Sequence, residues 1–101
     1  MSQDPVQSDP KHYRVEYEND RIRVLRIKYG PHEKSVSHTH PESAAIVLTE
    51  GRVKFTFPDG RTREAAVQPG EFHWHPAGEH LPENLTDQPL EVLMIELKPP
   101  R

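Results

Sequence analysis

Residues 30–51 read GPHEKSVSHTHPESAAIVLTEG, and two histidines in this stretch, His38 and His40, stand just before a short apolar run. In a β-strand, side chains two positions apart point to the same face, about 6.6 Å apart along the strand. Both imidazoles can therefore converge on one ion. For an isolated pair, two ordinary surface histidines are the favoured interpretation, because protein metal sites usually use three or more ligands. A third donor is needed from elsewhere in the chain.

Histidine is the side chain most often used for metal ligation and for proton transfer near neutral pH. Five of the seven histidines fall between positions 38 and 80, so the candidates for a third donor are His73, His75 and His80. The chain contains no cysteine, which excludes a disulfide framework, a thiolate nucleophile and a sulfur-based zinc site. The histidine-rich region is where function should be sought.

With 101 residues, the chain is long enough for one domain only. Thirteen Lys and Arg against sixteen Asp and Glu leave a net charge of −3, without the basic surface that nucleic-acid binding needs. The first ten residues carry two acids and two prolines, unlike a signal peptide, and no apolar run approaches a membrane span. We therefore expect a soluble, cytoplasmic protein with no nucleic-acid or membrane partner.

Eleven prolines and five glycines interrupt the chain too often for helices of average length, so the segments between them are expected to be strands. The pattern changes phase within residues 21–29, which indicates a bulge or burial on both faces. Gly60 is expected to take a left-handed turn conformation, and Asn84 to bond neighbouring backbone groups. The sequence predicts a β-sandwich or barrel over 13–97, between an arm at 1–12 and a tail at 98–101 that fray at the chain ends. The expected strands are 13–18, 21–29, 44–49, the hairpin of 52–57 and 61–67, the segment around 72–75, and 90–97.

Two stretches resemble the conserved motifs of the cupin superfamily. Residues 30–51 are similar to the first motif, Gly-x5-His-x-His-x3 or 4-Glu-x6-Gly, and residues 70–84 to the second, Gly-x5-Pro-x-Gly-x2-His-x3-Asn. The likeness covers about residues 20–97 and is greatest to small, single-domain bacterial cupins. It implies an all-β fold, the double-stranded β-helix or jelly-roll barrel, with a divalent metal bound inside by the motif histidines. It also implies a homodimer through a sheet face and exchanged N-terminal strands, for which residues 13–29 are the candidates.

Carried over position by position, the resemblance makes His38, His40 and His80 the metal ligands. Counting along the first motif places Ala44 where the family usually has a glutamate ligand, and some cupins are similar in using three histidines alone. Glu42 lies two residues earlier, on a turn, and is the nearest carboxylate. The spacing from Gly30 to His38 is two residues longer than in the family pattern, and the spacing before His80 is one residue shorter.

His73 and His75 share one face of a strand, and Phe72 and Trp74 share the other. If the histidines point inward, His75 can be a fourth ligand and His73 an acid or base next to the metal. Because apolar side chains more naturally belong inside, we expect the opposite arrangement. The residues expected to line the pocket are then Phe55, Phe72 and Trp74.

These observations favour a cupin that holds a divalent metal through three histidines and acts on a small molecule, with dioxygenase-, isomerase- or lyase-type chemistry. The alternative is a non-catalytic module that binds a small ligand or a metal, since one fold hosts many activities. Nitrogen-rich sites accept Fe, Mn, Ni, Zn or Cu, so the pattern does not select a metal. A second proton-transfer group beside the metal would favour the enzyme, and the candidates are His73, His75, Glu42 and Glu83.

Overall fold

The computed structural model describes residues 4–99 of the chain. Within this range the chain forms one short helix and nine strands, and all the strand pairs are antiparallel. None of the described helices has the length and apolar character of a membrane span. The elements are α1 (Pro5–Ser8), β1 (Tyr13–Glu18), β2 (Ile22–Tyr29), β3 (His38–His40), β4 (Ser43–Val47), β5 (Gly51–Thr56), β6 (Thr62–Val67), β7 (Phe72–His75), β8 (Gly78–Asn84) and β9 (Leu90–Leu97).

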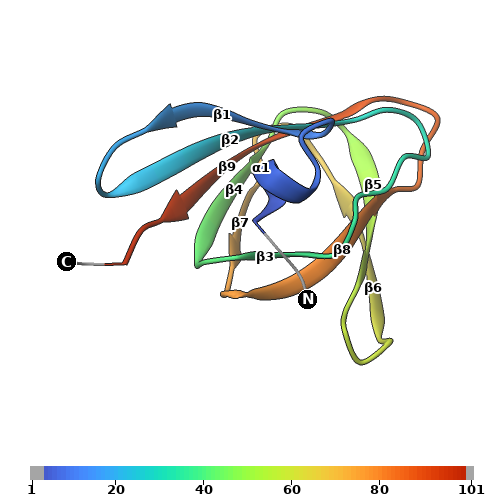
Figure 1. Ribbon diagram of the computed structural model, residues 1–101. Helices are drawn as coiled ribbons and strands as arrows, with labels where there is room; N and C mark the ends of the chain where they lie inside the picture. Colours follow the sequence, from blue (N-terminus) through green and yellow to red (C-terminus); the bar gives the residue numbers. More distant parts are fainter. Residues whose placement is uncertain (1–3, 100–101) are drawn as a thin grey trace.

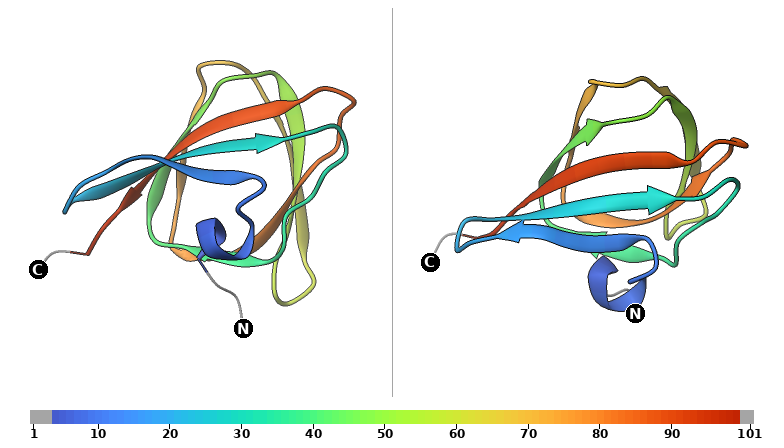
Figure 2. Two further views of the ribbon diagram at one scale, coloured as in Figure 1. Left: turned by 45° about the horizontal axis from the view of Figure 1, so that its top comes forward. Right: turned by 90° about the horizontal axis from the view of Figure 1, so that it is seen from above.

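The strands form two sheets that enclose a barrel-like interior (Figure 1). The five-stranded sheet has the order β1-β2-β9-β4-β7, and the four-stranded sheet has the order β3-β8-β5-β6. Figure 2 shows that the β1–β2 hairpin and the end of β9 extend beyond the barrel on one side. The predicted strands at 13–18 and 90–97 match β1 and β9 in both bounds.

The core lies where β2 and β9 face the interior with alternate residues. Leu25 pairs with Met94 and Tyr29 pairs with Leu90, and all four side chains are buried. Aliphatic side chains at every second position bury one face of each strand and leave the other to solvent or to a neighbouring element. For the phase change in 21–29 we expected either a bulge or burial on both faces, and the structure shows burial on both faces. Strand β2 pairs with β9 without a register shift, and Ile22 and Val24 are half-buried on its outer side.

The alternation expected in β1 produces burial only at Tyr13. Val15 and Tyr17 share its period but are exposed, Tyr17 by 56%. A register shift lies between these two residues, and the strand leaves the barrel at that point (Figure 1). No second sheet covers this part of β1, so the apolar period has nothing to pack against.

Residues 4–12 pack against the barrel, although we expected residues 1–10 to be a frayed end. Pro5 in α1 is fully buried, and Asp9 and His12 are also buried. Residues 1–3 of the expected arm and 100–101 of the expected tail lie outside the described residues. At the other end of the chain, the Lys98 amide donates to the Arg21 carbonyl.

The two turn predictions are confirmed. Gly60 has a φ of 90° in the turn between β5 and β6, a conformation that residues with a Cβ rarely adopt. Asn84 is fully buried at the end of β8. Its side-chain amide donates to the carbonyls of Gly30 and Gln88, at 3.0 and 2.8 Å, and its oxygen accepts from the Thr86 amide at 3.0 Å. Asn84 therefore ties the end of β8 to two loops.

We predict that Asn84→Ala lowers the free energy of unfolding by about 1–3 kcal/mol, because it leaves buried backbone groups without partners. Asn19, the other asparagine of the chain, accepts from the amides of Arg21 and Ile22 in an exposed turn, so Asn19→Ala is the matched control and should cost less. Urea unfolding of both variants measures the difference. Equal losses would show that burial of Asn84 does not set its contribution.

Candidate metal centre

Three histidines from β3 and β8 meet inside the barrel. His38 and His40 lie on the same face of β3. His80, on the neighbouring antiparallel strand β8, is directly opposite His38. One nitrogen from each ring lies within 4.8 Å of the others, and the ring centroids are 4.6–5.0 Å apart. The structure thus brings together the three histidines that the sequence motifs selected.

Two nitrogen atoms in this cluster are buried without a hydrogen-bond partner among the described residues: Nε2 of His40 and Nε2 of His80. A buried polar atom without a partner costs free energy, and native proteins rarely leave such atoms unpaired. Neutral imidazole nitrogens held close together are the donors that divalent transition metals prefer. The residues present therefore fit a divalent metal ion.

The orientation of His40 is set by a chain of charges from the five-stranded sheet. His40 Nδ1 donates to Glu96 Oε2 at 2.7 Å, and Arg23 Nε donates to Glu96 Oε1 at 2.8 Å. The Glu96 carboxylate is 2% exposed, and its ion pair with Arg23 compensates its charge. Arg23 also pairs with Asp4. Because a carboxylate can only accept, the proton lies on Nδ1 and the Nε2 lone pair faces the cluster.

His38 is held in the same tautomer by the backbone. Its Nδ1 donates to the Val36 carbonyl at 2.9 Å, and Ser35 Oγ lies 3.2 Å from the same nitrogen. Ser35 Oγ in turn donates to Asp9 Oδ2 at 2.6 Å, which links the ring to the segment after α1. On the opposite edge of the ring, Nε2 lies 3.2 Å from the Tyr13 hydroxyl. The loop before β3 and the N-terminal segment therefore position this ring jointly.

Burial keeps these imidazoles neutral. It lowers the pKa of His80 to about 2 and the pKa of His38 to about 4, and the neighbouring histidines add to both shifts. The pKa of His75 is lowered to about 4 for the same reason, with His40, His73 and Arg63 opposing its protonation as well. At neutral pH the rings of His38, His75 and His80 therefore each retain a lone pair. Both metal ligation and acceptance of a proton require this lone pair.

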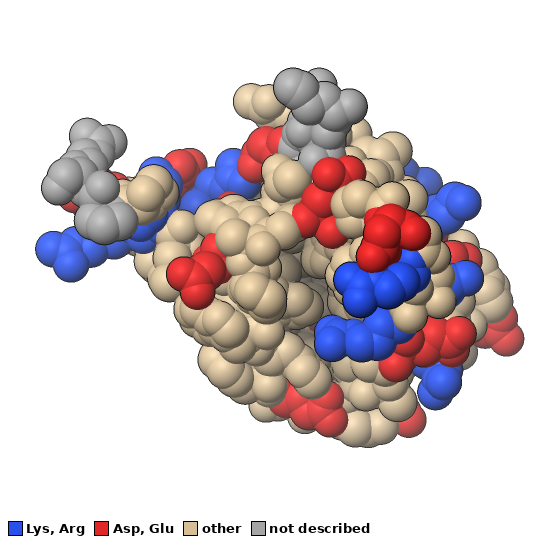
Figure 3. Space-filling view, turned by 90° about the horizontal axis from the view of Figure 1, so that it is seen from below, with Lys and Arg blue, Asp and Glu red and all other residues tan. Residues whose placement is uncertain are grey.

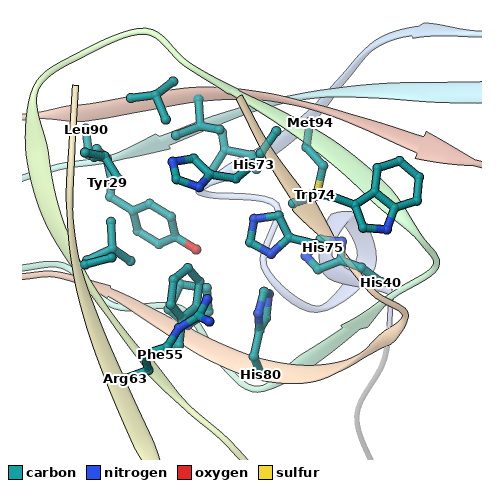
Figure 4. Close-up of a pocket in the computed structure, with 18 of the residues that line it drawn as sticks. Tyr29, His40, Phe55, Arg63, His73, Trp74, His75, His80, Leu90 and Met94 are labelled. Atoms are coloured by element: carbon teal, nitrogen blue, oxygen red, sulfur yellow. The ribbon is translucent and has the colours of Figure 1, made fainter. Parts of the chain in front are cut away.

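A cavity of about 250 Å³ lies next to the cluster. Figure 3 shows one face of the molecule with a hollow between uncharged side chains and with basic side chains gathered along one side of it. The cavity wall is mostly apolar and comes from both sheets, and Figure 4 shows His40, His75 and His80 on one side of the space. The Tyr29 hydroxyl lies 2.6 Å from the Tyr13 hydroxyl, and burial raises the pKa of both phenols. The apolar part of the lining includes Ile27, Ala45, Val47, Val53, Phe55, Val67, Leu90, Val92 and Met94.

The expected orientation of β7 is wrong. His73 and His75 point toward the cavity (Figure 4). Phe72 and Trp74, on the other face of the strand, are 60% and 48% exposed. Strand β7 is the edge of the five-stranded sheet, so its outer face has no covering layer and the two aromatic rings remain in solvent. Trp74 borders the cavity only from this outer position, and Phe72 does not line it, whereas Phe55 does.

The position assigned to the missing glutamate also needs correction. The motif count selects Ala44, but in β4 the buried residues are Ser43, Ala45 and Val47, and Ala45 rather than Ala44 lines the cavity. Ala44 pairs with Trp74 and therefore lies on the outer face. A count along the sequence cannot detect this, because a shift of one residue moves a side chain to the other face of a strand.

The remaining candidates are placed as follows. Glu42 is exposed, and neither Glu42 nor Glu83 lines the cavity. His73 lines it, but its Nε2 pairs with Glu71 at 3.0 Å. His75 lines it without joining the three-histidine cluster, its ring centroid being 6.2 Å from that of His80. Of the four candidate proton-transfer groups, His73, His75, Glu42 and Glu83, only His75 lines the described cavity without pairing with a carboxylate.

The sequence predicts surface positions for both His12 and His32, and for His12 this prediction is wrong. Its ring is buried against the Tyr29 ring at 4.5 Å, and its Nδ1 and Nε2 pair with Asp9 and Glu33 at 2.8 and 3.1 Å. His32, expected at the surface on the same grounds, is exposed. A histidine in a polar sequence can be buried when carboxylates elsewhere in the chain satisfy both ring nitrogens.

Sequence reasoning missed three groups at the site, namely Glu96, Arg63 and the Tyr13–Tyr29 pair. Glu96 had a readable signal, because it continues the inward series of Leu90 and Met94 with a carboxylate. Arg63 likewise continues the series of Ala65 and Val67. The tyrosine pair had no such signal, since it joins residues sixteen positions apart on neighbouring strands.

Residues 25–96 match the Cupin domain family. The chain belongs to the cupin family. Solved cupin structures resemble it closely enough to confirm the predicted all-β, double-stranded β-helix fold. A cupin domain from Bordetella pertussis has a TM-score of 0.80 at 24% identity, over 86% of this chain and 92% of that one. No match is found among curated proteins.

Two further similar structures widen this comparison of the cupin. A cupin-2 domain protein from Shewanella frigidimarina has a TM-score of 0.58 at 24% identity, over 85% of this chain and 79% of that one. The polyketide cyclase RemF from Streptomyces resistomycificus has a TM-score of 0.64 at 27% identity, over 87% of this chain and 66% of that one. The barrel is therefore shared with both an enzyme and small cupin domains.

We predict that the metal-free cupin loses stability as the pH falls from 7 to 5. The unfolded chain protonates His38, His75 and His80 near pH 6.5, whereas the folded chain keeps them neutral down to about pH 4 or below. Protons therefore favour the unfolded state, and the loss should be on the order of 1–2 kcal/mol per imidazole. Urea unfolding in the presence of a chelator measures the trend, and His75→Asn should reduce it. A free energy of unfolding that stays constant over this range would contradict the prediction.

Proposed function

We propose that this cupin holds one divalent metal ion through His38, His40 and His80 and acts on a small molecule bound in the adjacent cavity. The observation that carries the proposal is the pair of buried Nε2 atoms, on His40 and His80, that lack any hydrogen-bond partner among the described residues. A structural histidine core would be expected to satisfy both atoms. A divalent ion satisfies both at once.

The chain's own residues prepare the site in three ways. Glu96 and the Val36 carbonyl hold protons on Nδ1 of His40 and His38, so that the Nε2 atoms of both rings carry the lone pair. The Nε2 atom of His40 has no partner among the described residues, and that of His38 lies 3.2 Å from the Tyr13 hydroxyl. Three neutral imidazoles leave the full charge on the ion, which favours an anionic or oxygen-bearing ligand. When bound, the ion supplies Lewis-acid or oxygen-activating chemistry to that ligand.

His75 is the group that can move a proton. It faces the cavity, it is neutral at pH 7 because burial lowers its pKa to about 4, and it lies outside the three-histidine cluster. A neutral imidazole within reach of a bound substrate can accept a proton and return it later in the reaction. The Tyr13 and Tyr29 hydroxyls stay protonated. Because one of them donates to the other, at most one hydroxyl of the pair can donate a hydrogen bond to an oxygen atom of the substrate.

These features support dioxygenase-, isomerase- or lyase-type chemistry, with Fe, Mn, Ni, Zn or Cu as the ion. The similar Streptomyces protein is a polyketide cyclase, which supports a small-molecule enzyme. The second candidate is a module that binds a metal or a small ligand without turnover. The absence of any carboxylate among the residues that line the described cavity favours this binding module. Apart from the three-histidine cluster and His73, which pairs with Glu71, His75 is then the one proton acceptor in the lining.

We predict that tag-free protein binds about one divalent ion per chain and that His38→Ala, His40→Ala and His80→Ala each weaken binding by about 100-fold or more, because each removes one of three ligands. His75→Ala is the matched control, since it removes a neighbouring cavity histidine outside the cluster. Elemental analysis and competition with a chromogenic chelator measure the effect.

The result that overturns this ligand set is His80→Ala with full occupancy while His75→Ala loses the metal. Ala44→Glu provides a second check. Because Ala44 lies on the outer face of β4, its carboxylate should leave the affinity unchanged. Oxygen uptake and substrate turnover by the Fe-, Mn-, Ni-, Zn- and Cu-loaded forms then separate the enzyme from the binding module, which would retain the metal and turn nothing over.

We further propose that the chain works as a homodimer through residues 13–29. Strand β1 forms one edge of the five-stranded sheet, and it carries Val15 and Tyr17 exposed. Sheet edges of this kind are normally protected or paired with another strand. A chain of 101 residues with 33% hydrophobic content also has little core of its own.

Light scattering should therefore give twice the chain mass of 11.7 kDa at micromolar concentrations. Tyr17→Lys should shift the protein to monomer, because it places a charge on the exposed apolar edge. Asp20→Lys, a change in the exposed turn that follows β1, is the control and should leave the dimer intact. A monomer of the unmodified chain would refute this assembly.

A further inference from the structure

The cavity beside the histidine cluster has one formally charged lining residue at neutral pH, Arg63. Its position follows from strand alternation, since Arg63, Ala65 and Val67 form the inward series of β6. The residue is exposed, so it borders the opening of the cavity rather than its floor. Phe55, on the neighbouring strand β5, is directly opposite Arg63, and the guanidinium carbon lies 5.9 Å from the centre of its ring (Figure 4).

Arg63 differs from the other arginines of its hairpin in lacking a carboxylate partner. Arg52 pairs with Glu64 at 3.3 Å, and Arg61 pairs with Asp59 at 2.5 Å, both on the outside of the hairpin. Among residues 4–99, Arg63 makes no salt bridge and no side-chain hydrogen bond. Its contact with Phe55 holds the planar guanidinium over the face of an aromatic ring and leaves the N–H groups of the guanidinium available as hydrogen-bond donors.

We propose that the cavity takes small monocarboxylic acids with an apolar body, and that Arg63 binds the carboxylate at the opening. The proposal rests on the proposed function in taking this cavity as the substrate site. A planar guanidinium with free donors matches a carboxylate through two parallel hydrogen bonds. The apolar wall from Val47, Val53 and Val92 accepts the rest of the molecule.

The size and charge of the cavity narrow the class further. A cavity of about 250 Å³ lies at the small end of the range of ligand pockets, so it favours a small ligand. A single arginine compensates one negative charge. A phosphate dianion would need further donors at the opening, and Arg63 is the only Arg or Lys that lines the described cavity. A monocarboxylate is therefore favoured over a phosphate ester.

The same arrangement gives the bound molecule a direction. With the carboxylate at Arg63, the apolar body extends past Phe55, whose ring stacks on the His80 ring with centroids 5.2 Å apart. His75 lies 6.0 Å from Phe55 between ring centroids, on the same side of the space (Figure 4). The part of the molecule that follows the carboxylate is thereby presented to His75 and His80. Arg63 acts as a specificity residue at the opening of the cavity.

Calorimetry with benzoate and benzamide tests this assignment, because the two probes share size and shape and differ in charge. We expect benzoate to bind more tightly than benzamide, and Arg63→Gln to weaken benzoate by about tenfold while leaving benzamide unchanged. Arg63→Lys should recover part of the affinity, since it keeps the charge but loses the fork. Arg61→Gln is the matched control on the same hairpin and should have no effect, because Arg61 points outward to Asp59.

The measurement is made on both metal-free and zinc-loaded protein, so that it is independent of the proposed function. A preference for benzoate that depends on Arg63 in the metal-free protein supports the inference even if the three histidines hold no metal. Metal binding by the histidines without this preference overturns the inference and leaves the proposed function standing. Equal losses of both probes in Arg63→Gln, tighter binding of phenyl phosphate, or no benzoate binding at all would each overturn it.

Discussion

The pairing of β3 with β8 is the contact on which the rest of the site depends. It places His80 directly opposite His38 and brings His40 onto the same inner face, so that three rings from positions 38–80 share one small volume. Strand pairing sets this geometry because side-chain direction alternates and the register is specified by backbone hydrogen bonds. A slip of one residue would turn His80 out of the barrel and leave only an ordinary pair of histidines on β3.

The five-stranded sheet completes the centre from the other side of the barrel. Glu96 on β9 orients His40, Arg23 on β2 compensates Glu96, and Asp4 before α1 compensates Arg23. Each charge in this series is paired, which is the condition under which a protein interior tolerates charge. The N-terminal segment thus contributes to the site at both His40 and His38, although it lies at the end of the chain that we expected to be frayed.

The cavity combines apolar and polar side chains on its inner surface, whereas a hydrophobic sequence pattern assigns only apolar side chains to the interior. Its wall is mostly apolar, yet His75, His80 and Arg63 place polar groups along it. The rule that apolar side chains lie inside failed at β7 because the interior at that point is a cavity rather than packed core, while the outer face of this edge strand leaves Phe72 and Trp74 exposed. It succeeded in β2 and β9, where the interior is packed core.

The sequence by itself determined the β-rich architecture, the cupin family, and the choice of His38, His40 and His80, because these depend on local alternation, turn residues and the spacing of two motifs. Only the tertiary structure decided which face of β7 points inward, that Ala45 rather than Ala44 lines the cavity, and that Glu96 and Arg63 belong to the site. The physical reason is that a strand has two faces with the same local pattern. Which one is buried depends on the neighbouring strands and the opposite sheet, and those contacts join residues far apart in the chain.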